Sequence, residues 1–314
     1  MKMMIVVVDH VYLEEEHIKR LRSLGNLKIF KEPPRTHDYL KRRVKDADIV
    51  IVGWSKLTRD VIDSAKKLRM ISIWATSCHY ADVQAAKEKG IVVTHVPGYA
   101  TEAVAEHAFA LILAAARKLL SADKHVRKGG FDWRPFGGIE LCGKTLGIIG
   151  TGSIGYRVAE ISKAFKMQVL GYDKYPNMKR AEELGMKYVE LHALLRKSDF
   201  ITLHVTLTSE TEGLVGKREF ELVKDGALIV NTSQGKVIDE KALIEALKSG
   251  RVSYAGLDVF EVEPPTKDNP LFGLSNTILT PHIGFHTVEA VKRCSDICID
   301  NVAKFLEGCP QNLC

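Results

Sequence analysis

The sequence predicts an α/β protein with two doubly wound parallel-sheet domains, and three patterns carry this prediction. Short apolar runs alternate with amphipathic helical patterns through the first hundred residues. A glycine-rich turn at residues 150–155 then connects another apolar run to a helical stretch. Further strand and helix patterns follow this turn as far as residue 280. Strands that alternate with helices form parallel sheets that are covered on both faces.

The first hundred residues contain four runs typical of buried strands, separated by helical patterns that end near glycines. The strands are expected at residues 4–8, 48–52, 70–74 and 91–94. The helices are expected at residues 14–23, 37–44, 58–65 and 82–87. The opening MKMMIVVVDH has a short apolar run and no small-residue cleavage site, so we interpret it as a strand and not as a signal peptide.

A long alanine-rich helix is expected next, at residues 101–120, with Thr101 as its N-cap. It is apolar on most sides, so we expect it to be largely buried as a connector between domains or as a subunit interface. The glycine, proline and tryptophan residues of 129–138 predict a loop.

The segment from Lys144 to Asp173 is the most informative part of the chain. A strand at 145–149 leads through Gly150, Gly152 and Gly155 into a helix, and a second strand at 167–172 ends on Asp173. This order is the fingerprint of dinucleotide binding, in which the helix N-terminus faces a pyrophosphate. The terminal acid can accept hydrogen bonds from a ribose diol and would repel a 2′-phosphate. The pattern therefore predicts NAD in preference to NADP.

The remaining elements continue the alternation to the end of the chain. Strands are expected at residues 188–189, 200–204, 227–231, 254–257 and 277–280. Helices are expected at residues 191–196, 217–223, 240–247 and 287–307. Since the chain stops soon after the last helix, we expect no additional regulatory domain.

Composition narrows the possible partners. The net charge of +6 is spread over lysine- and glutamate-rich helices without a basic stripe, so we expect no nucleic-acid binding. No apolar run approaches the ~20 residues that span a bilayer, so we expect no membrane partner. The six cysteines lack paired zinc-site spacing, which predicts no metal site and, by default, a reducing cytoplasm. Cys294 and Cys298 are expected in the core, and the redox state of Cys309 and Cys314 is left open.

Several further motifs occur in a fixed order around the glycine turn: PGYATEAVAEHAFAL at 97–111, NTSQG at 231–235, GLDVFEVEPP at 256–265, TPHIG at 280–284 and FLEGCPQN at 305–312. With them the chain resembles the D-isomer-specific 2-hydroxyacid dehydrogenase family nearly end to end. The resemblance implies a flavodoxin-like substrate domain (residues 1–98 plus 285–314) and a Rossmann NAD-binding domain (residues 99–284). It also implies a homodimer and a small-molecule substrate bound in the cleft between the domains.

The resemblance implies a proton-exchange pair. His282 stands in the place of the family's catalytic histidine, and Glu263 in the place of its carboxylate partner. Histidine suits this task because its pKa lies near the working pH, so it can both accept and donate a proton. The acid would fix the imidazole tautomer and favour its charged form. The other histidines, such as His107 and His125, are expected to be packing or surface residues.

The resemblance also implies a set of cofactor contacts and substrate contacts. Cofactor binding is expected from Gly150, Gly152, Ser153, Ile154, Gly155, Asp173, Val205, Thr206, Thr232, Ser233, Asp258, Gly284 and Thr76. Substrate contacts are expected from Ser77, Cys78, His79 and Gln234.

Two departures from the family concern the substrate. Gln234, in a catalytic position, replaces the arginine that pairs with a substrate carboxylate, and glutamine carries no charge. Hydrogen bonds to charged groups contribute roughly 1.5–3 kcal/mol, so the loss corresponds to about 10- to 150-fold. The loop ATSCHY at 75–80 also lacks the usual glycines. Three explanations are open: an altered substrate or a cation from elsewhere, which we favour; a weak or inactive NAD-binding sensor; or a single inactivating substitution.

Overall fold

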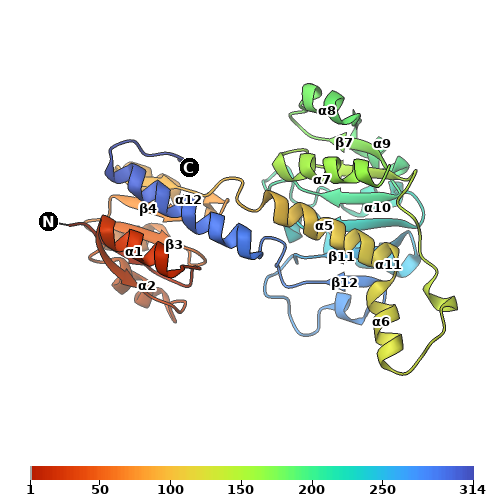
Figure 1. The fold of residues 1–314 in the computed structure, drawn as a ribbon, viewed down its shortest axis with the longest axis horizontal. Helices are drawn as coiled ribbons and strands as arrows, with labels where there is room; N and C mark the ends of the chain where they lie inside the picture. Colours follow the sequence, from red (N-terminus) through yellow and green to blue (C-terminus); the bar gives the residue numbers. More distant parts are fainter. Residues whose placement is uncertain (1) are drawn as a thin grey trace. The chain divides into compact units, whose positions relative to one another are not determined.

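The computed structural model describes residues 2–314 and divides into two compact units (Figure 1). Unit 1 comprises the chain up to Ala100 together with His286–Cys314. Unit 2 comprises Thr101–Phe285. The chain therefore leaves unit 1 once, builds unit 2 without interruption, and returns to complete unit 1 with its last helix.

Within its described residues, unit 1 contains a five-stranded parallel sheet with the order β2-β1-β3-β4-β5, the flavodoxin-like order. Its strands are β1 (Met4–Val7), β2 (Asn26–Ile29), β3 (Ile49–Val52), β4 (Met70–Ile73) and β5 (Val92–Thr94). Its helices are α1 (Glu15–Leu24), α2 (His37–Val44), α3 (Arg59–Ser64), the 3₁₀ turn η1 (Cys78–Tyr80), α4 (Val83–Glu88) and α12 (Val288–Leu306).

The sheet of unit 1 is buried on both faces, which explains its continuous apolar strands. All four residues of β3 and all four of β4 are buried. One face packs against α2, α3 and α4 through residues such as Leu40, Val61 and Ala85. Helices α1 and α12 contact each other, and α12 lies against β4 (Figure 1).

Strand β2 is the element of unit 1 that the sequence did not predict. It lies at the edge of the sheet, and its residues alternate between exposed and half-buried. Such a strand has no apolar run to reveal it. The other strands and the α-helices of unit 1 lie where they were expected, with ends shifted by at most one residue, whereas the short turn η1 was not predicted.

Within its described residues, unit 2 contains a seven-stranded parallel sheet, and the order β12-β11-β10-β9-β6-β7-β8 is that of a Rossmann fold with one added strand. The strands are β6 (Thr145–Ile149), β7 (Gln168–Tyr172), β8 (Lys187–Tyr188), β9 (Phe200–Leu203), β10 (Ala227–Asn231), β11 (Val252–Leu257) and β12 (Thr277–Leu279). The helices are α5 (Thr101–Ala116), α6 (Leu119–Arg127), α7 (Ser153–Ala164), α8 (Met178–Leu184), α9 (Leu191–Lys197), α10 (Lys217–Leu222) and α11 (Glu240–Ser249), with 3₁₀ turns η2 (Arg134–Phe136), η3 (Gly235–Val237) and η4 (Pro270–Gly273).

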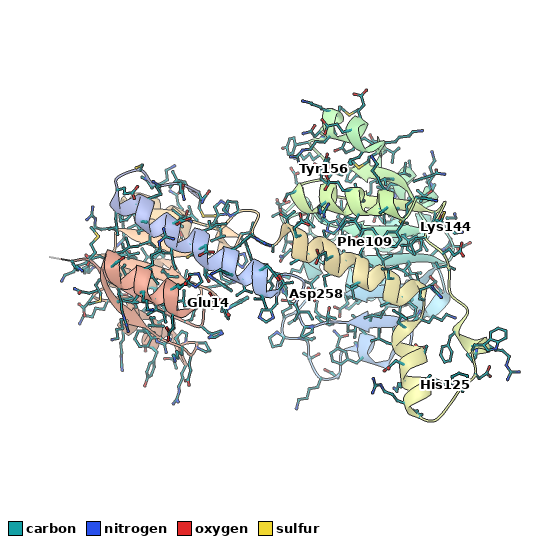
Figure 2. All side chains as sticks on the ribbon, in the orientation of Figure 1. Glu14, Phe109, His125, Lys144, Tyr156 and Asp258 are labelled. Atoms are coloured by element: carbon teal, nitrogen blue, oxygen red, sulfur yellow. A yellow bond between two sulfur atoms is a disulfide. The ribbon has the colours of Figure 1, made fainter. Side chains whose placement is uncertain are left out.

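Two helical layers cover the sheet of unit 2. Helices α5 and α7 lie side by side on one face, where Phe109 stacks on Phe165 with ring centroids 5.4 Å apart (Figure 2). Helices α9, α10 and α11 pack on the other face through residues such as Leu195, Phe220 and Leu243. The predicted α/β class with two doubly wound parallel sheets is confirmed.

For unit 2, one predicted helix boundary was wrong and one helix was missed. The helix expected at 101–120 ends at Ala116, and Lys118, with a left-handed φ of +51°, separates it from α6. Helix α5 is therefore a core helix packed on β10 and β11, which does not favour it as a subunit interface. Helix α8 was not predicted, because Ala181 is its one buried residue and its pattern is mostly polar.

The cysteines fall into three environments. Cys294 and Cys298 are buried on α12, as expected for core residues. Cys142 and Cys309 are exposed free thiols. Cys78 and Cys314 form a disulfide, a pairing that the sequence did not predict and that is unusual for the reducing compartment taken as the default. None of the helices in residues 2–314 is long and apolar enough to cross a membrane.

Candidate active site

The glycine turn between β6 and α7 has the geometry that close approach of a phosphate requires. Gly150 has a φ of +91°, and a Cβ there would lie 2.7 Å from the backbone of Val205. At Gly155 a Cβ would lie 2.0 Å from the carbonyl oxygen of Gly150, so this glycine lets the helix start close to the strand. A Cβ on Gly152 would meet nothing within 4 Å. The turn is thus tight on its protein side and open beside Gly152.

Helix α7 presents its N-terminus at this opening. It begins at Ser153, and Gly152 in the N-cap position supplies no side chain to accept from the first-turn N–H groups. These groups, and the positive end of the helix dipole, are therefore available to an anion such as a pyrophosphate.

Asp173 follows β7 and is held in one orientation by its neighbours. One carboxylate oxygen accepts hydrogen bonds from the N–H of Thr151 (2.6 Å) and from its hydroxyl (3.0 Å). The other oxygen accepts from the N–H of Tyr175 (2.9 Å). A carboxylate has about four acceptor sites, so Asp173 retains capacity for a ribose hydroxyl. Its negative charge still disfavours a 2′-phosphate.

Two buried polar atoms without partners lie at the carboxyl ends of neighbouring strands. Among the described residues, Nδ1 of His204 and Oγ1 of Thr232 are buried and make no hydrogen bond. Leu203 on β9 is paired with Asn231 on β10, so His204 and Thr232 follow at the same level of the sheet. Burial lowers the pKa of His204 to about 3, so the ring is neutral. Buried polar groups are nearly always satisfied, and a bound dinucleotide at this edge would explain both atoms.

His282 and Glu263 form the candidate proton-exchange pair. Nδ1 of His282 lies 2.8 Å from a carboxylate oxygen of Glu263. The other carboxylate oxygen accepts from the N–H of Phe260 at 3.1 Å. The hydrogen bond and charge of Glu263 raise the pKa of His282 against the opposing effect of burial. Burial acts to raise the pKa of Glu263, but its hydrogen bonds from His282 and Phe260 outweigh this effect and lower it.

The backbone of His282 is held in an unusual conformation. Its φ of +54° lies in the left-handed region, which costs a non-glycine residue energy and is found where surrounding contacts enforce it. The N–H of His282 donates to the carbonyl oxygens of Asp258 (2.8 Å) and Thr280 (3.0 Å). With Nδ1 occupied by Glu263, the geometry leaves Nε2 as the ring atom that can exchange a proton with a substrate oxygen.

Asp258 clamps the segment that carries His282. Its side chain is 2% exposed. One carboxylate oxygen accepts from the hydroxyl of Thr280 (2.6 Å) and the N–H of Ile283 (2.8 Å), and the other accepts from the N–H of Gly284 (2.7 Å). Burial acts to raise the pKa of Asp258, but the hydrogen bonds from His107, Thr280, Ile283 and Gly284 together outweigh burial and lower this pKa. Asp258, labelled in Figure 2 and predicted as a cofactor contact, thus also positions the segment that carries His282.

The segment NTSQG forms a turn between β10 and η3. The hydroxyl and the N–H of Ser233 both donate to the side-chain oxygen of Asn231. The side-chain NH₂ of Asn231 donates to the backbone carbonyl oxygen of Gln234 at 2.9 Å. A Cβ on Gly235 would collide with the backbone of Phe260 at 1.9 Å. Within residues 2–314 the side-chain amide of Gln234 makes no hydrogen bond, so it is available to a ligand.

Four predicted residues belong to unit 1 and follow β4. The hydroxyl of Thr76 donates to the carbonyl oxygen of Val96 at 2.9 Å. Oγ of Ser77 lies 2.5 Å from Nδ1 of His79. Burial, and then the charge of Lys56, lowers the pKa of His79. Cys78 is bonded to Cys314 in a disulfide, so its side chain is not a free thiol.

Three residues that sequence reasoning did not assign lie at these places. His107, expected to be a packing or surface residue, has Nε2 3.1 Å from the hydroxyl of Thr280 and 3.4 Å from a carboxylate oxygen of Asp258. His204 supplies one of the unpartnered buried atoms. Cys314 pairs with Cys78. No spacing in the sequence connects these residues with their partners. Among the described residues, no cluster of three or more acids, histidines or cysteines could hold a metal ion.

Comparisons with known proteins identify the family to which this chain is similar. The family model described as "D-isomer specific 2-hydroxyacid dehydrogenase, NAD binding domain" matches residues 109–284. A D-3-phosphoglycerate dehydrogenase of Archaeoglobus fulgidus is 42% identical over 95% of this chain and 56% of its own length. A glyoxylate reductase of Korarchaeum cryptofilum is 40% identical over 96% of this chain and 93% of its own. The chain thus spans about half the length of the phosphoglycerate dehydrogenases that it matches.

Solved structures give the same result. An acyclic imino acid reductase in complex with NADPH and D-Arg has a TM-score of 0.92 at 36% identity, over 99% of this chain and 100% of that one. The D-lactate dehydrogenase of Aquifex aeolicus with NAD and lactic acid has a TM-score of 0.85 at 33% identity, over 97% and 96% of the two chains. This chain belongs to the D-isomer-specific 2-hydroxyacid dehydrogenase family. The residues that match the NAD-binding domain model, 109–284, all lie in unit 2.

Proposed function

We propose that this protein transfers a hydride between NAD and a small D-2-hydroxy acid or 2-keto acid. The observation that carries the proposal is the 2.8 Å pair of His282 and Glu263, in a unit that also has the dinucleotide turn. Bound NADH supplies the hydride. In the direction of reduction, Nε2 of the His282 imidazolium donates a proton to the developing alkoxide, and in oxidation the neutral ring accepts it. Glu263 keeps Nδ1 protonated and stabilises the charged ring.

The cofactor contacts predicted from the sequence are part of this proposal, and the geometry of unit 2 supports several of them. Gly150, Gly152 and Gly155 shape the turn, the first turn of α7 offers N–H groups, and Asp173 keeps acceptor capacity that a ribose hydroxyl could use. All the cofactor-binding roles stay predictions, including those of Ser153, Ile154, Val205, Thr206, Thr232, Ser233, Asp258, Gly284 and Thr76. The substrate contacts of Ser77, Cys78, His79 and Gln234 stay predictions as well, and so does the cytoplasmic location.

Gln234 makes substrate choice the open part of the proposal. Its amide can donate two hydrogen bonds to a carboxylate but cannot neutralise its charge. We favour an enzyme with an altered substrate, because the proton-exchange pair and the dinucleotide turn are intact. The alternative is a catalytically weak NAD(H)-binding sensor or corepressor-like protein.

The proposal is tested by separating cofactor binding from turnover. NADH affinity is measured by calorimetry, and NADH oxidation is assayed with glyoxylate, hydroxypyruvate, pyruvate, small aldehydes and an α-imino acid. The last is included because one structural relative is named as an imino acid reductase. The unaltered chain, Gln234→Arg and His282→Asn are compared.

We expect the unaltered chain to bind NADH and to turn over at least one substrate. His282→Asn is expected to abolish turnover with NADH affinity nearly unchanged. A gain of about tenfold or more in Gln234→Arg on a 2-keto acid would show that the charge at position 234 limits the reaction, since 1.4 kcal/mol is tenfold and hydrogen bonds to charges contribute more. Tight NADH binding without turnover in either the unaltered chain or Gln234→Arg would favour the sensor.

We further propose that the protein is a homodimer that uses unit 2. Helix α6 and the segment after it extend away from the sheet (Figure 1). They expose large apolar side chains: Leu119 (53%), Leu120 (53%), Val126 (56%), Phe131 (96%) and Trp133 (82%). Contiguous exposed apolar surface of this kind marks an interaction site. The interface would therefore lie on α6 and its loop, and not on the buried helix α5.

A further inference from the structure

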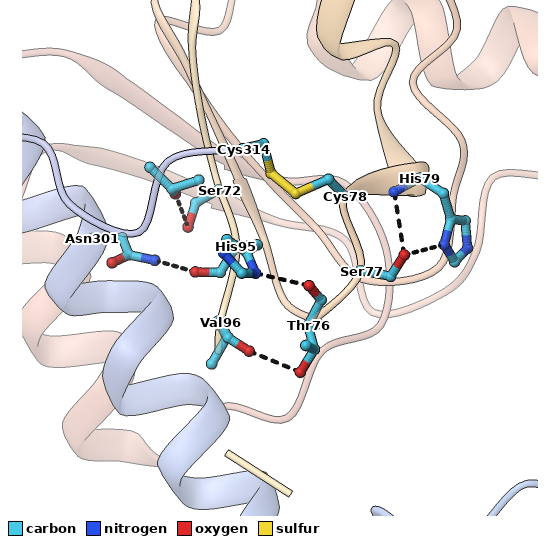
Figure 3. Close-up of a disulfide and its surroundings, with 10 residues drawn as sticks. Ser72, Thr76, Ser77, Cys78, His79, His95, Val96, Asn301 and Cys314 are labelled. Atoms are coloured by element: carbon cyan, nitrogen blue, oxygen red, sulfur yellow. Dashed lines mark hydrogen bonds between the residues drawn. A yellow bond between two sulfur atoms is a disulfide. The ribbon is translucent and has the colours of Figure 1, made fainter. Parts of the chain in front are cut away.

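The disulfide of unit 1 joins two segments that are 236 residues apart in the sequence (Figure 3). Cys78 is the first residue of η1, in the loop that follows β4. Cys314 lies beside β5, and the two Cα atoms are 6.0 Å apart, an ordinary separation for a disulfide. The bond therefore connects the loop predicted to contact substrate with the last segment of the chain.

The segment 312–314 is held firmly in place. It pairs antiparallel with the edge strand β5, where the N–H of Cys314 donates to the carbonyl oxygen of Val93 at 3.0 Å. The N–H of His95 donates to the carbonyl oxygen of Asn312, also at 3.0 Å. The amide of Asn312 donates to the buried side chain of Asn301 on α12 at 2.8 Å. The amide of Asn301 donates in turn to the carbonyl oxygen of His95, also at 2.8 Å (Figure 3). The backbone of Cys314 is thus held in place by its hydrogen bond to β5.

The loop 76–80 is hydrogen-bonded at both ends, and at its far end the carbonyl oxygen of Tyr80 accepts from the N–H of Leu57 at 2.8 Å. In its middle the half-buried Cys78 packs against the core of unit 1. Thr76 is attached to the segment after β5 by its bond to Val96 and by the 2.7 Å contact between its carbonyl oxygen and the ring of His95. The short contact between Ser77 and His79 joins two residues of the loop to each other and not to the rest of unit 1. Between them, Cys78 is the residue whose side chain is covalently bound to a fixed segment.

We propose that Cys314 is a positioning residue for substrate binding, because its disulfide with Cys78 holds Ser77 and His79 in their bound geometry. Reduction of the bond releases the loop and lowers the affinity for substrate, and oxidation restores it. The inference rests on the proposed function, in which this loop contacts substrate.

The redox step balances with a small disulfide such as oxidised glutathione as the oxidant. The Cys314 thiolate attacks one glutathione sulfur, and a glutathione thiolate leaves. The Cys78 thiolate then attacks the Cys314 sulfur of the mixed disulfide, and the second glutathione thiolate leaves. Two protein thiols lose two electrons, and the two protons they give up end on the two glutathione thiols. A dithiol such as dithiothreitol reverses the step.

The size of the effect follows from the fraction of time that the free loop keeps its bound geometry. The apparent dissociation constant equals the intrinsic constant divided by this fraction. A loop that holds the geometry about one-fifth of the time would raise the KM for substrate about fivefold. The kcat and the NADH dissociation constant are expected to stay within about twofold. A change in the loop alters the affinity only of a ligand that binds its two states differently, and substrate is the ligand that contacts this loop in the proposal.

The experiment first establishes the bond. The full chain treated with oxidised glutathione is denatured and titrated for thiols, and its peptides are mapped by mass spectrometry. Because the chain has six cysteines and one disulfide, we expect four thiols before reduction and a peptide containing Cys78 bound to Cys314. Six thiols, or a different pairing, would overturn the proposal.

The second stage measures the consequence of the bond with a matched control. KM, kcat and NADH affinity are measured for the oxidised and the reduced chain, for Cys78→Ser, for Cys314→Ser and for Cys309→Ser. Cys309 is an exposed free thiol five positions before Cys314, so Cys309→Ser should respond to redox state as the unaltered chain does. Cys78→Ser and Cys314→Ser should keep the raised KM under all conditions. A Cys314→Ser enzyme with the KM of the oxidised chain would refute the positioning role.

Amide exchange separates failure of this inference from failure of the proposed function. Reduction should speed exchange of the His79 and Ala81 amides while those of β4 stay protected, whether or not a substrate is turned over. One outcome is that NADH binds and no substrate reacts, while amide exchange in the loop still rises on reduction. The proposed function would then be wrong, but the disulfide would still hold the loop. Unchanged amide exchange in the loop on reduction would refute the proposal that the disulfide holds the loop.

Discussion

Removing the carboxylate of Asp258 is expected to release the segment that carries His282. In Asp258→Ala the N–H groups of Ile283 and Gly284 lose the acceptors that now lie 2.8 and 2.7 Å away, and the hydroxyl of Thr280 loses its acceptor at 2.6 Å. The left-handed φ of His282 then loses part of the framework that enforces it. Both stability and catalysis should therefore decrease.

The magnitude follows from how well water can replace each lost bond. An unsatisfied buried N–H costs about 1–3 kcal/mol. Gly284 is buried, so it contributes fully, whereas Ile283 is 41% exposed and contributes near the lower end. We expect the free energy of unfolding of unit 2 to fall by about 2–4 kcal/mol. A displacement of about 1 Å in a catalytic group can lower a rate 10²-fold, so kcat should fall by about that factor.

Urea unfolding followed by circular dichroism measures the first effect, and steady-state turnover the second. Amide exchange at Ile283 and Gly284 locates the change within unit 2. Asp225→Ala is the matched control, because that carboxylate is 83% exposed and its surface pair with Arg251 should contribute at most about 1 kcal/mol. If Asp258→Ala loses no more stability than this control, or if kcat is unchanged, the clamp has been assigned wrongly.

Three further predictions concern the pair, the glycine turn and the subunit interface. Glu263 raises the pKa of His282, and the charged ring of His282 is the proton donor in reduction, so activity in that direction is lost as pH rises through this pKa. In Glu263→Gln the pKa of His282 should fall, and the alkaline limb of the kcat/KM profile should move to lower pH. A limb that does not move would rule out the pair. Gly155→Ala should weaken NADH binding and destabilise unit 2 by about 1–3 kcal/mol through overpacking. Gly137→Ala is the control, because a Cβ at Gly137 meets nothing within 4 Å. Equal effects of the two substitutions would contradict this prediction. Phe131→Asp should shift the protein toward monomer in sedimentation without unfolding it, and an unchanged mass would place the interface elsewhere.

The nucleotide-binding turn could be predicted because its requirements are local. Gly150, Gly152 and Gly155 are needed for one backbone turn, and Asp173 ends the next strand along the chain. The pair of His282 and Glu263 could be predicted from the family resemblance alone, since a separation of nineteen residues gives no hint that the two side chains meet. The clamp by Asp258 was assigned a different role, because its acceptor bonds to Ile283 and Gly284 exist only once β11 and β12 lie side by side.

Some elements escaped prediction because their patterns are weak. Strand β2 is an exposed edge strand, and α8 buries little. The break at Lys118 is set by a left-handed residue that the alanine-rich pattern does not reveal. In these places tertiary contacts outweighed local propensity.

By itself, the sequence determined the class of the protein: an α/β chain with an NAD-binding turn and two parallel sheets. These properties depend on apolar periodicity and on glycines within a few residues of one another, so they can be read along the chain. Only the tertiary structure decided which distant groups meet. It placed His107 beside Asp258, left His204 and Thr232 without partners at one sheet edge, and bound Cys78 to Cys314. Contacts of this kind depend on strand order and register, which no short stretch of sequence specifies.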